Sequence, residues 1–165
     1  MEHFNEEQRM LKRWWFLLLP ALVVGILPLF IGDKAEGHPE AIVIPLVVAG
    51  LVLALFGFSS LKTSINEQRI YVKFIPFMVK AKEINWDDVV YAEVKKYDPL
   101  FEYGGWGYRK GWKRKKMALN VYGNTGLELH LKDDTKLMIG TQKKESLISY
   151  LTYIKQKYHL QQIVN

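Results

Sequence analysis

The chain has 165 residues, no cysteine and a formal net charge of +6. The absence of cysteine excludes disulfides, thiolate chemistry and cysteine-based metal sites, so an apolar core must stabilise the fold. The charge is uneven along the chain. Residues 1–60 contain four basic and six acidic residues, whereas residues 61–165 contain nineteen and eleven, a net charge of +8.

Two apolar runs without a charged residue occupy residues 14–31 and 41–61. As α-helices they would be about 27 and 31 Å long, which matches a hydrocarbon core of about 30 Å. We therefore predict a two-helix transmembrane hairpin over residues 14–61, after an N-terminal tail at 1–13 and before a domain at 62–165. A cleaved signal peptide is the alternative for the first run, but that run exceeds the usual apolar length of about 7–15 residues.

Basic residues predict the orientation of this hairpin. They flank both apolar runs, whereas the loop between the runs has only Lys34. The positive-inside rule then places both termini on the cytoplasmic side of the inner (cytoplasmic) membrane in a multi-pass protein. Trp14 and Trp15 are expected to be interfacial anchors, since tryptophan is enriched at the membrane surface.

Small residues at four-residue spacing predict close helix packing within the hairpin. They are Ala21 and Gly25 in the first run and Gly50 and Ala54 in the second. Homodimerisation through the same residues is the alternative, and the sequence leaves the oligomeric state open. Neither run holds an ionisable residue, which argues against a transporter or channel.

From residue 61 the hydropathy alternates as in strands, with turn residues between the segments. The spacing is typical of an antiparallel meander. The seven expected strands lie at residues 61–65, 69–77, 78–84, 89–97, 117–121, 127–131 and 135–140.

The C-terminal segment changes to helical periodicity. Leu147, Leu151, Ile154 and Tyr158 fall on one apolar stripe, and Thr141 is the expected N-cap. Seven strands followed by one amphipathic helix is the order of a pleckstrin-homology-type barrel or sandwich that its C-terminal helix closes.

The chain resembles small bacterial membrane proteins that join a two-helix hairpin to a pleckstrin-homology-like domain. The hairpin carries this resemblance, together with the segments EINWDDV at 83–89, YGGWG at 103–107, GNTGL at 123–127 and IGTQ at 139–142. The resemblance implies a fold and a location, and it implies no catalytic residue.

Residues 98–116 form the segment that stands out, because they lack clear strand periodicity and combine aromatic with basic residues. Such a segment fits three interpretations: a structural loop, a contact with anionic lipid headgroups, or a contact with a protein. The candidate contact residues are Trp106, Arg109, Lys110, Trp112, Lys113, Arg114, Lys115 and Lys116.

No pattern in the sequence favours an enzyme. The four histidines are scattered without metal-ligand spacing, and the Asp87-Asp88 and Asp133-Asp134 pairs are typical of turns. No phosphate loop, dinucleotide fingerprint or nucleophile elbow is present. We therefore expect no catalytic residue, no metal and no cofactor.

These observations predict a non-enzymatic, membrane-anchored adaptor or regulatory module that presents its domain for contact with a protein or with anionic lipid. The expected partners are the lipids of the anionic leaflet and a membrane protein; nucleic acid is not expected. The alternatives are a headgroup-reading module that uses residues 98–116 and an accessory subunit of a larger membrane complex.

Overall fold

The computed structural model describes residues 3–10, 40–111 and 115–164. The chain divides into two compact units. One comprises residues 1–8 and 60–165, and the other comprises residues 9–59. Each unit is described by itself.

The unit at residues 9–59 contains helix α3 (Glu40–Phe58), whose residues are almost all apolar and which includes Pro45. Among the helices that the described residues form, none combines the length and the hydropathy that a membrane crossing requires. This finding contradicts the predicted two-helix transmembrane hairpin and the multi-pass location with both termini cytoplasmic. The run at 41–61 is shorter as a helix than predicted, because α3 ends at Phe58 and a strand begins at Ser60.

Several predictions for this unit concern residues outside the described ranges. These are the span at 14–31, the anchors Trp14 and Trp15, and the packing residues Ala21 and Gly25. Gly50 and Ala54 lie on α3 and are exposed, and a Cβ built at Gly50 would meet no atom within 4 Å. Their role in helix packing stays a prediction.

Sheet A is a four-stranded sheet with the order β1-β2-β3-β4. Its strands are β1 (Phe4–Arg9), β2 (Ser60–Ile65), β3 (Arg69–Ile75) and β4 (Lys82–Asn85). Alternation sends one face of each strand into the core: Leu61, Ile65, Ile70 and Phe74 are fully buried. Residues 4–9, which fall in the expected N-terminal tail, therefore form an edge strand of the domain.

Sheet B is a six-stranded sheet with the order β10-β5-β8-β9-β7-β6. Its strands are β5 (Val89–Lys96), β6 (Gly107–Lys110), β7 (Lys116–Asn120), β8 (Thr125–Leu131), β9 (Lys136–Gly140) and β10 (Ile163–Val164). β8 and β9 approach closely at Gly126, where a Cβ would lie 2.6 Å from the Ile139 carbonyl oxygen. A side chain at this position would separate the two strands.

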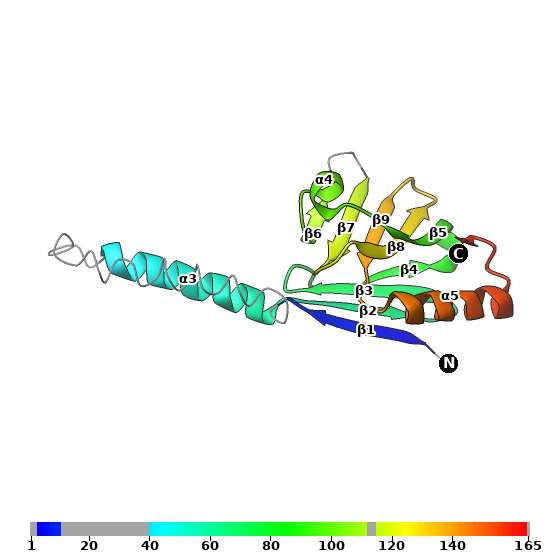
Figure 1. Cartoon of the computed structure of the whole chain (residues 1–165), viewed down its shortest axis with the longest axis horizontal. Helices are drawn as coiled ribbons and strands as arrows, with labels where there is room; N and C mark the ends of the chain where they lie inside the picture. Colours follow the sequence, from blue (N-terminus) through cyan, green and yellow to red (C-terminus); the bar gives the residue numbers. More distant parts are fainter. Residues whose placement is uncertain (1–2, 11–39, 112–114, 165) are drawn as a thin grey trace. The chain divides into compact units, whose positions relative to one another are not determined.

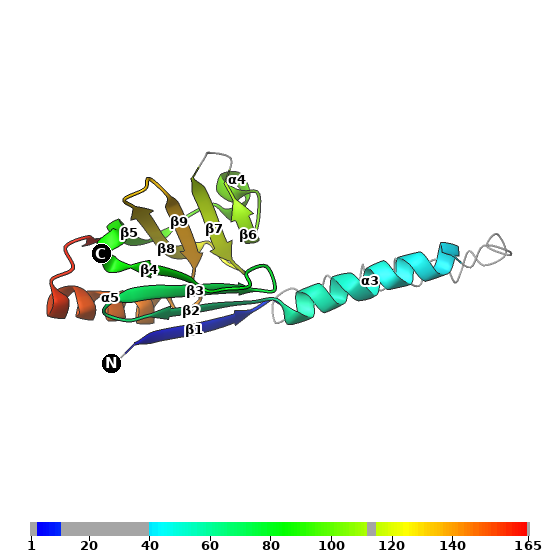
Figure 2. The ribbon, with the colours of Figure 1, turned by 180° about the vertical axis from the view of Figure 1, so that it is seen from behind.

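The two sheets form two layers joined by the short 3-10 helix η3 (Trp86–Asp88), which links β4 to β5 (Figures 1 and 2). Helix α5 (Lys144–Tyr158) runs alongside sheet A and buries Leu147, Tyr150, Leu151 and Ile154. Tyr158 is 41% exposed, so the predicted apolar stripe ends before it. Lys143, and not the predicted Thr141, is the N-cap of α5.

The predicted seven-stranded antiparallel meander is also wrong. β7 pairs with β9 in parallel, and β10 pairs with β5 in parallel. Two parallel neighbours need a crossover connection between them. Here β8 is part of that connection: it follows β7 in the chain, lies on the far side of β9, and leads back into β9. The predicted strand segments exist, but they belong to two sheets, and β1, β6 and β10 add strands that the sequence did not indicate.

Candidate functional site

The segment at 98–116, predicted to lack strand periodicity, is largely regular in the structure. It contains helix α4 (Pro99–Tyr103) and strand β6, which forms a hairpin with β7. Pairing of β6 with β7 was not visible in the sequence, because its four residues include Gly107 and two exposed basic side chains. The predicted contacts Trp112, Lys113 and Arg114 lie outside the described residues.

Hydrogen bonds fix both ends of α4. The Asp98 carboxylate caps the helix by accepting from the backbone N–H groups of Leu100 and Phe101 at 2.9 and 3.0 Å. Glu102 accepts from the Asp98 N–H at 2.9 Å and from the Lys116 ammonium at 3.0 Å. Burial alone would raise the pKa of Glu102, but these two donors together hold it below its ordinary value. Gly104 ends the helix at φ 72°, a left-handed conformation that favours glycine.

Tyr103 of α4 contacts a buried polar cluster formed by Tyr97 and Asn120. The Asn120 amide donates to the Tyr97 hydroxyl at 2.7 Å and accepts from the Gly107 N–H at 2.8 Å. The Tyr97 and Tyr103 rings meet edge to face at 5.8 Å. Burial raises the pKa of Tyr97 to about 12, and burial, with the nearby Glu128 and Glu102 charges, also raises the pKa of Tyr103.

The raised pKa of Tyr97 predicts alkaline destabilisation. Burial disfavours the charged phenolate, so the native state holds the Tyr97 proton more tightly than the unfolded chain does. In the unfolded chain the tyrosine pKa is near 10.0. The contribution of the protonated Tyr97 to the free energy of unfolding is complete below pH 10 and is lost as the pH rises through about 12. A shift of this size corresponds to about 3 kcal/mol. Urea unfolding at several pH values should show this loss, and Tyr97→Phe should reduce the slope.

Tyr71→Phe, on the outer face of sheet A, is the matched control for this measurement. It removes a hydroxyl without touching the Asn120 cluster. If Tyr97→Phe keeps the wild-type dependence of unfolding free energy on pH between about 10 and 12, the burial argument for Tyr97 is wrong.

Four of the predicted basic contacts lie in the described part of the segment, and Arg109, Lys115 and Lys116 among them have partners within the fold. The Lys115 ammonium donates to the Asp133 carbonyl oxygen at 2.6 Å, and the Lys116 ammonium lies 4.6 Å from the centre of the Tyr103 ring as well as against Glu102. Trp106 Nε1 donates to the Gly123 carbonyl oxygen at 2.9 Å, and Arg109 Nε donates to the Trp106 carbonyl oxygen. These contacts account for Trp106, Lys115 and Lys116 as parts of the framework.

The same segment still presents an uncovered surface, which we call the α4 platform. On α4, Leu100 is 55% exposed and Phe101 is 86% exposed. Arg109 and Lys110 are exposed on the neighbouring β6–β7 hairpin, which the Glu102–Lys116 contact ties to α4. The α4 platform comprises Leu100, Phe101, Arg109 and Lys110.

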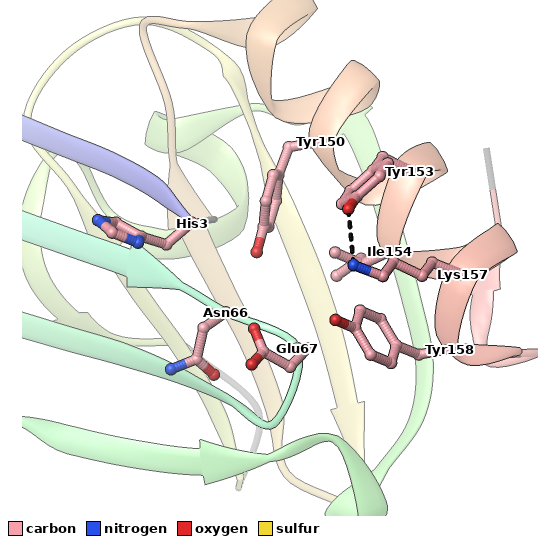
Figure 3. Close-up of a pocket in the computed structure, with 8 residues that line it drawn as sticks. All are labelled: His3, Asn66, Glu67, Tyr150, Tyr153, Ile154, Lys157 and Tyr158. Atoms are coloured by element: carbon pink, nitrogen blue, oxygen red, sulfur yellow. Dashed lines mark hydrogen bonds between the residues drawn. The ribbon is translucent and has the colours of Figure 1, made fainter. Parts of the chain in front are cut away.

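A second candidate site is an open cavity of about 390 Å³ between α5 and the β2–β3 turn, here called the α5 cavity. Figure 3 shows the Tyr150, Lys157 and Tyr158 side chains reaching from α5 toward Glu67 on that turn. Lys157 Nζ donates to the Tyr153 hydroxyl at 3.0 Å and lies 5.4 and 5.3 Å from the Tyr153 and Tyr158 ring centres. The hydrogen bond to Tyr153 raises the pKa of Lys157.

Acidic residues elsewhere have structural partners. The Asp133 carboxylate accepts from the Thr135 N–H at 2.9 Å in the turn before β9, as expected for a turn residue. Glu128 is buried on β8, where it pairs with Lys95 and has His130 Nε2 at 3.5 Å. Among residues 3–10, 40–111 and 115–164, no three His, Asp or Glu side chains gather as a metal site.

The sequence did not indicate the α5 cavity. Tyr150, Tyr153 and Tyr158 recur at helical spacing beside the predicted apolar stripe, and Lys157 lies among them. This helical spacing was the only sequence signal for the cavity, and it is equally typical of side chains that pack in a core. The opposing Glu67 comes from a turn more than eighty residues earlier.

Comparison with known proteins adds no assignment to this geometry. No known protein family matches the chain, and no curated protein sequence matches it either. The resemblance to pleckstrin-homology-like proteins therefore stays a prediction.

Proposed function

We propose that the chain is a non-catalytic adaptor or regulatory module that binds a partner protein through the α4 platform. The observation that carries this proposal is the exposure of Leu100 and Phe101 on a helix whose ends are held by Asp98, Glu102 and Lys116. Apolar and aromatic side chains dominate binding energy at protein interfaces. Because hydrogen bonds already order this turn, binding costs less conformational entropy.

The internal contacts of the basic residues favour a protein over a lipid surface. Lys115 and Lys116 are engaged with Asp133, Asp134 and Glu102, which leaves Arg109 and Lys110 as the outward cations in the described part of the segment. Each available cation contributes about 1 kcal/mol to binding of anionic lipid headgroups. Internal pairing of Lys115 and Lys116 therefore weakens lipid binding more than it weakens binding of a protein through Phe101. The partner that fits is a protein segment with one apolar anchor for Phe101 and acidic residues for Arg109 and Lys110.

Site-specific photocrosslinking in cells tests this proposal. A p-benzoyl-phenylalanine in place of Leu100 in the full chain should form one dominant adduct. The crosslinked peptide, identified by mass spectrometry, should carry acidic residues. In the same background Phe101→Ala should lower the adduct yield at least about tenfold, since anchor truncation typically costs 2 kcal/mol or more. Lys110→Glu should lower it too, and the loss should depend on salt.

Phe77→Ala is the matched control, because Phe77 is 51% exposed on the β3–β4 turn and is not part of the α4 platform. The adduct yield should not change in this variant. Equal yields for Phe101→Ala and wild type would overturn the proposal. So would flotation of the full chain with phosphatidylserine-containing vesicles that depends on Phe101 and Lys110, a result that favours the headgroup alternative.

A further inference from the structure

One wall of the α5 cavity carries a carboxylate, that of Glu67. Glu67 is half-buried at the β2–β3 turn, and the described residues give it no hydrogen bond and no salt bridge. Its neighbour Asn66 is rigid: the Asn66 side chain accepts from the N–H groups of Gln68 and Arg69 at 2.9 and 2.8 Å, and its carbonyl accepts from Trp86. The turn therefore fixes the backbone at Glu67, whose carboxylate has no partner among the described residues.

The opposite wall holds a cation. Lys157 projects from α5 between the rings of Tyr153 and Tyr158, and its ammonium is bonded to a phenol hydroxyl and not to a carboxylate. Lys157 and Glu67 line the same cavity without forming a salt bridge to each other. Glu67 and Lys157 thus line one cavity, together with His3, and neither of the two has an ion-pair partner among the described residues.

The surface between the charges suits a small organic ligand. Tyr150 and Ile154 are buried at the base, and Tyr153 and Tyr158 are 37% and 41% exposed at the rim. Burial, together with the negative charge of Glu67, raises the pKa of Tyr150 to about 12. The cavity volume of about 390 Å³ lies in the usual range for small-molecule sites, about 300–1,000 Å³.

We propose that the α5 cavity binds a small zwitterion of the amino-acid class, with its ammonium group on Glu67 and its carboxylate on Lys157. A cationic ligand would pair with Glu67 but would lie opposite the like charge of Lys157, and an anionic ligand would pair with Lys157 but would lie opposite Glu67. A zwitterion satisfies both walls, and its carbon chain packs on the tyrosine rings. Charge-assisted hydrogen bonds at both ends are about twice as strong as neutral ones.

Calorimetric titration of the full chain with three zwitterions tests the proposal and measures the gap between the charges. Alanine, β-alanine and γ-aminobutyrate place the ammonium and carboxylate one, two and three carbons apart. One of them should bind at least about tenfold more tightly than butylamine or butyrate, which carry a single charge. A tenfold preference corresponds to about 1.4 kcal/mol.

Charge variants connect the binding to this cavity. Glu67→Gln and Lys157→Met should each weaken binding of the preferred zwitterion at least about tenfold. Lys144→Met and Glu145→Gln, exposed in the first turn of α5, are the matched controls and should leave it unchanged. The double reversal Glu67→Lys with Lys157→Glu should restore binding that each single reversal abolishes, because the ligand can bind in the opposite orientation.

Three results would overturn the proposal. They are the absence of zwitterion binding at about 10 mM, binding of butylamine or butyrate as tight as that of the best zwitterion, and a double reversal that does not recover binding. The α5 cavity and the α4 platform share no residue, so none of these results bears on partner binding through Phe101.

Discussion

Trp86→Ala is expected to lower the free energy of unfolding by about 4 kcal/mol, since truncating a buried tryptophan typically costs about 3–5 kcal/mol. Trp86 is 2% exposed, and it bonds two separate segments, the β2–β3 turn and the segment before β10. Its Nε1 donates to the Asn66 carbonyl at 2.9 Å, its N–H donates to the Gln68 carbonyl at 3.1 Å, and its carbonyl accepts from the Gln162 side chain at 3.1 Å. The indole thus fills the corner where sheet A passes into sheet B.

Urea unfolding measures this effect. Native domains are stable by only about 5–15 kcal/mol, so the alanine variant should lose a large part of its stability and unfold at a much lower urea concentration. Trp86→Phe keeps most of the ring and should lose about 1–2 kcal/mol, the usual cost of leaving a buried carbonyl without its donor. Phe77→Ala, an exposed aromatic truncation, should change the midpoint little.

A midpoint for Trp86→Ala within error of that for Phe77→Ala would contradict the central position given to the indole. Equal losses for Trp86→Ala and Trp86→Phe would show instead that the Asn66 hydrogen bond, and not the packed ring volume, dominates. The phenylalanine variant therefore separates the two physical contributions.

Local patterns in the sequence predicted the strands that bury one face. β3 and β8 alternate because Ile70, Val72 and Phe74, and likewise Leu127 and Leu129, face the core. The C-terminal helix was predicted for the same reason, through Leu147, Leu151 and Ile154. Such periodicity reflects only which side chains are buried, and it contains no information about which strand lies next to which. The parallel pairing of β7 with β9 could therefore not be predicted from the sequence.

The apolar runs gave the wrong architecture for a related reason. Hydropathy shows that residues 41–61 are apolar, but it does not show the environment of each side chain: Ile44 and Leu51 on α3 are exposed, whereas Leu61 is buried. Leu61 fell both in the predicted span and in the predicted strand at 61–65, and it lies in β2 with none of its surface exposed. Ser59 and Ser60 before it mark the change from helix to strand.

The candidate sites were predicted in part. The segment at 98–116 was singled out by its aromatic and basic residues, and its role as a contact surface stays a prediction. The sequence could not show that Lys115 and Lys116 bond within the fold. The α5 cavity was missed because its charges come from Glu67 and Lys157, ninety residues apart. Only tertiary structure brings such residues together.

The sequence did not predict β1, because two of its three buried residues, Glu6 and Gln8, are polar. Glu6 carries the second large effect. Glu6 is 5% exposed and its carboxylate accepts from the Thr141 hydroxyl at 2.6 Å and the Gln142 N–H at 2.7 Å. It also lies near the N-terminal end of α5, where the helix dipole favours negative charge. Glu6→Ala should cost about 3 kcal/mol, because it leaves both donors without an acceptor.

The loss should be centred on β1, which hydrogen exchange can resolve. Amides of β1 should exchange faster in Glu6→Ala, while those of β8 keep most of their protection. Glu7→Ala is the matched control: Glu7 is an exposed neighbour whose carboxylate lies 3.8 Å from the Lys62 ammonium, and surface pairs of this kind contribute about 0–1 kcal/mol. Equal exchange in the two variants would contradict the role given to Glu6.

A double-mutant cycle separates the hydrogen bond from the general effect of losing a carboxylate. Thr141→Val removes the hydroxyl with little change in shape, and it should be destabilising in the wild type but much less so beside Glu6→Ala. Directly bonded partners show coupling energies of about 0.5–3 kcal/mol, whereas independent sites add within about 0.5 kcal/mol. Strictly additive losses would mean that Glu6 stabilises β1 through the Gln142 N–H and the helix dipole alone. A coupling of 1 kcal/mol or more would show that a buried polar contact, and not apolar periodicity, holds the first strand in the sheet.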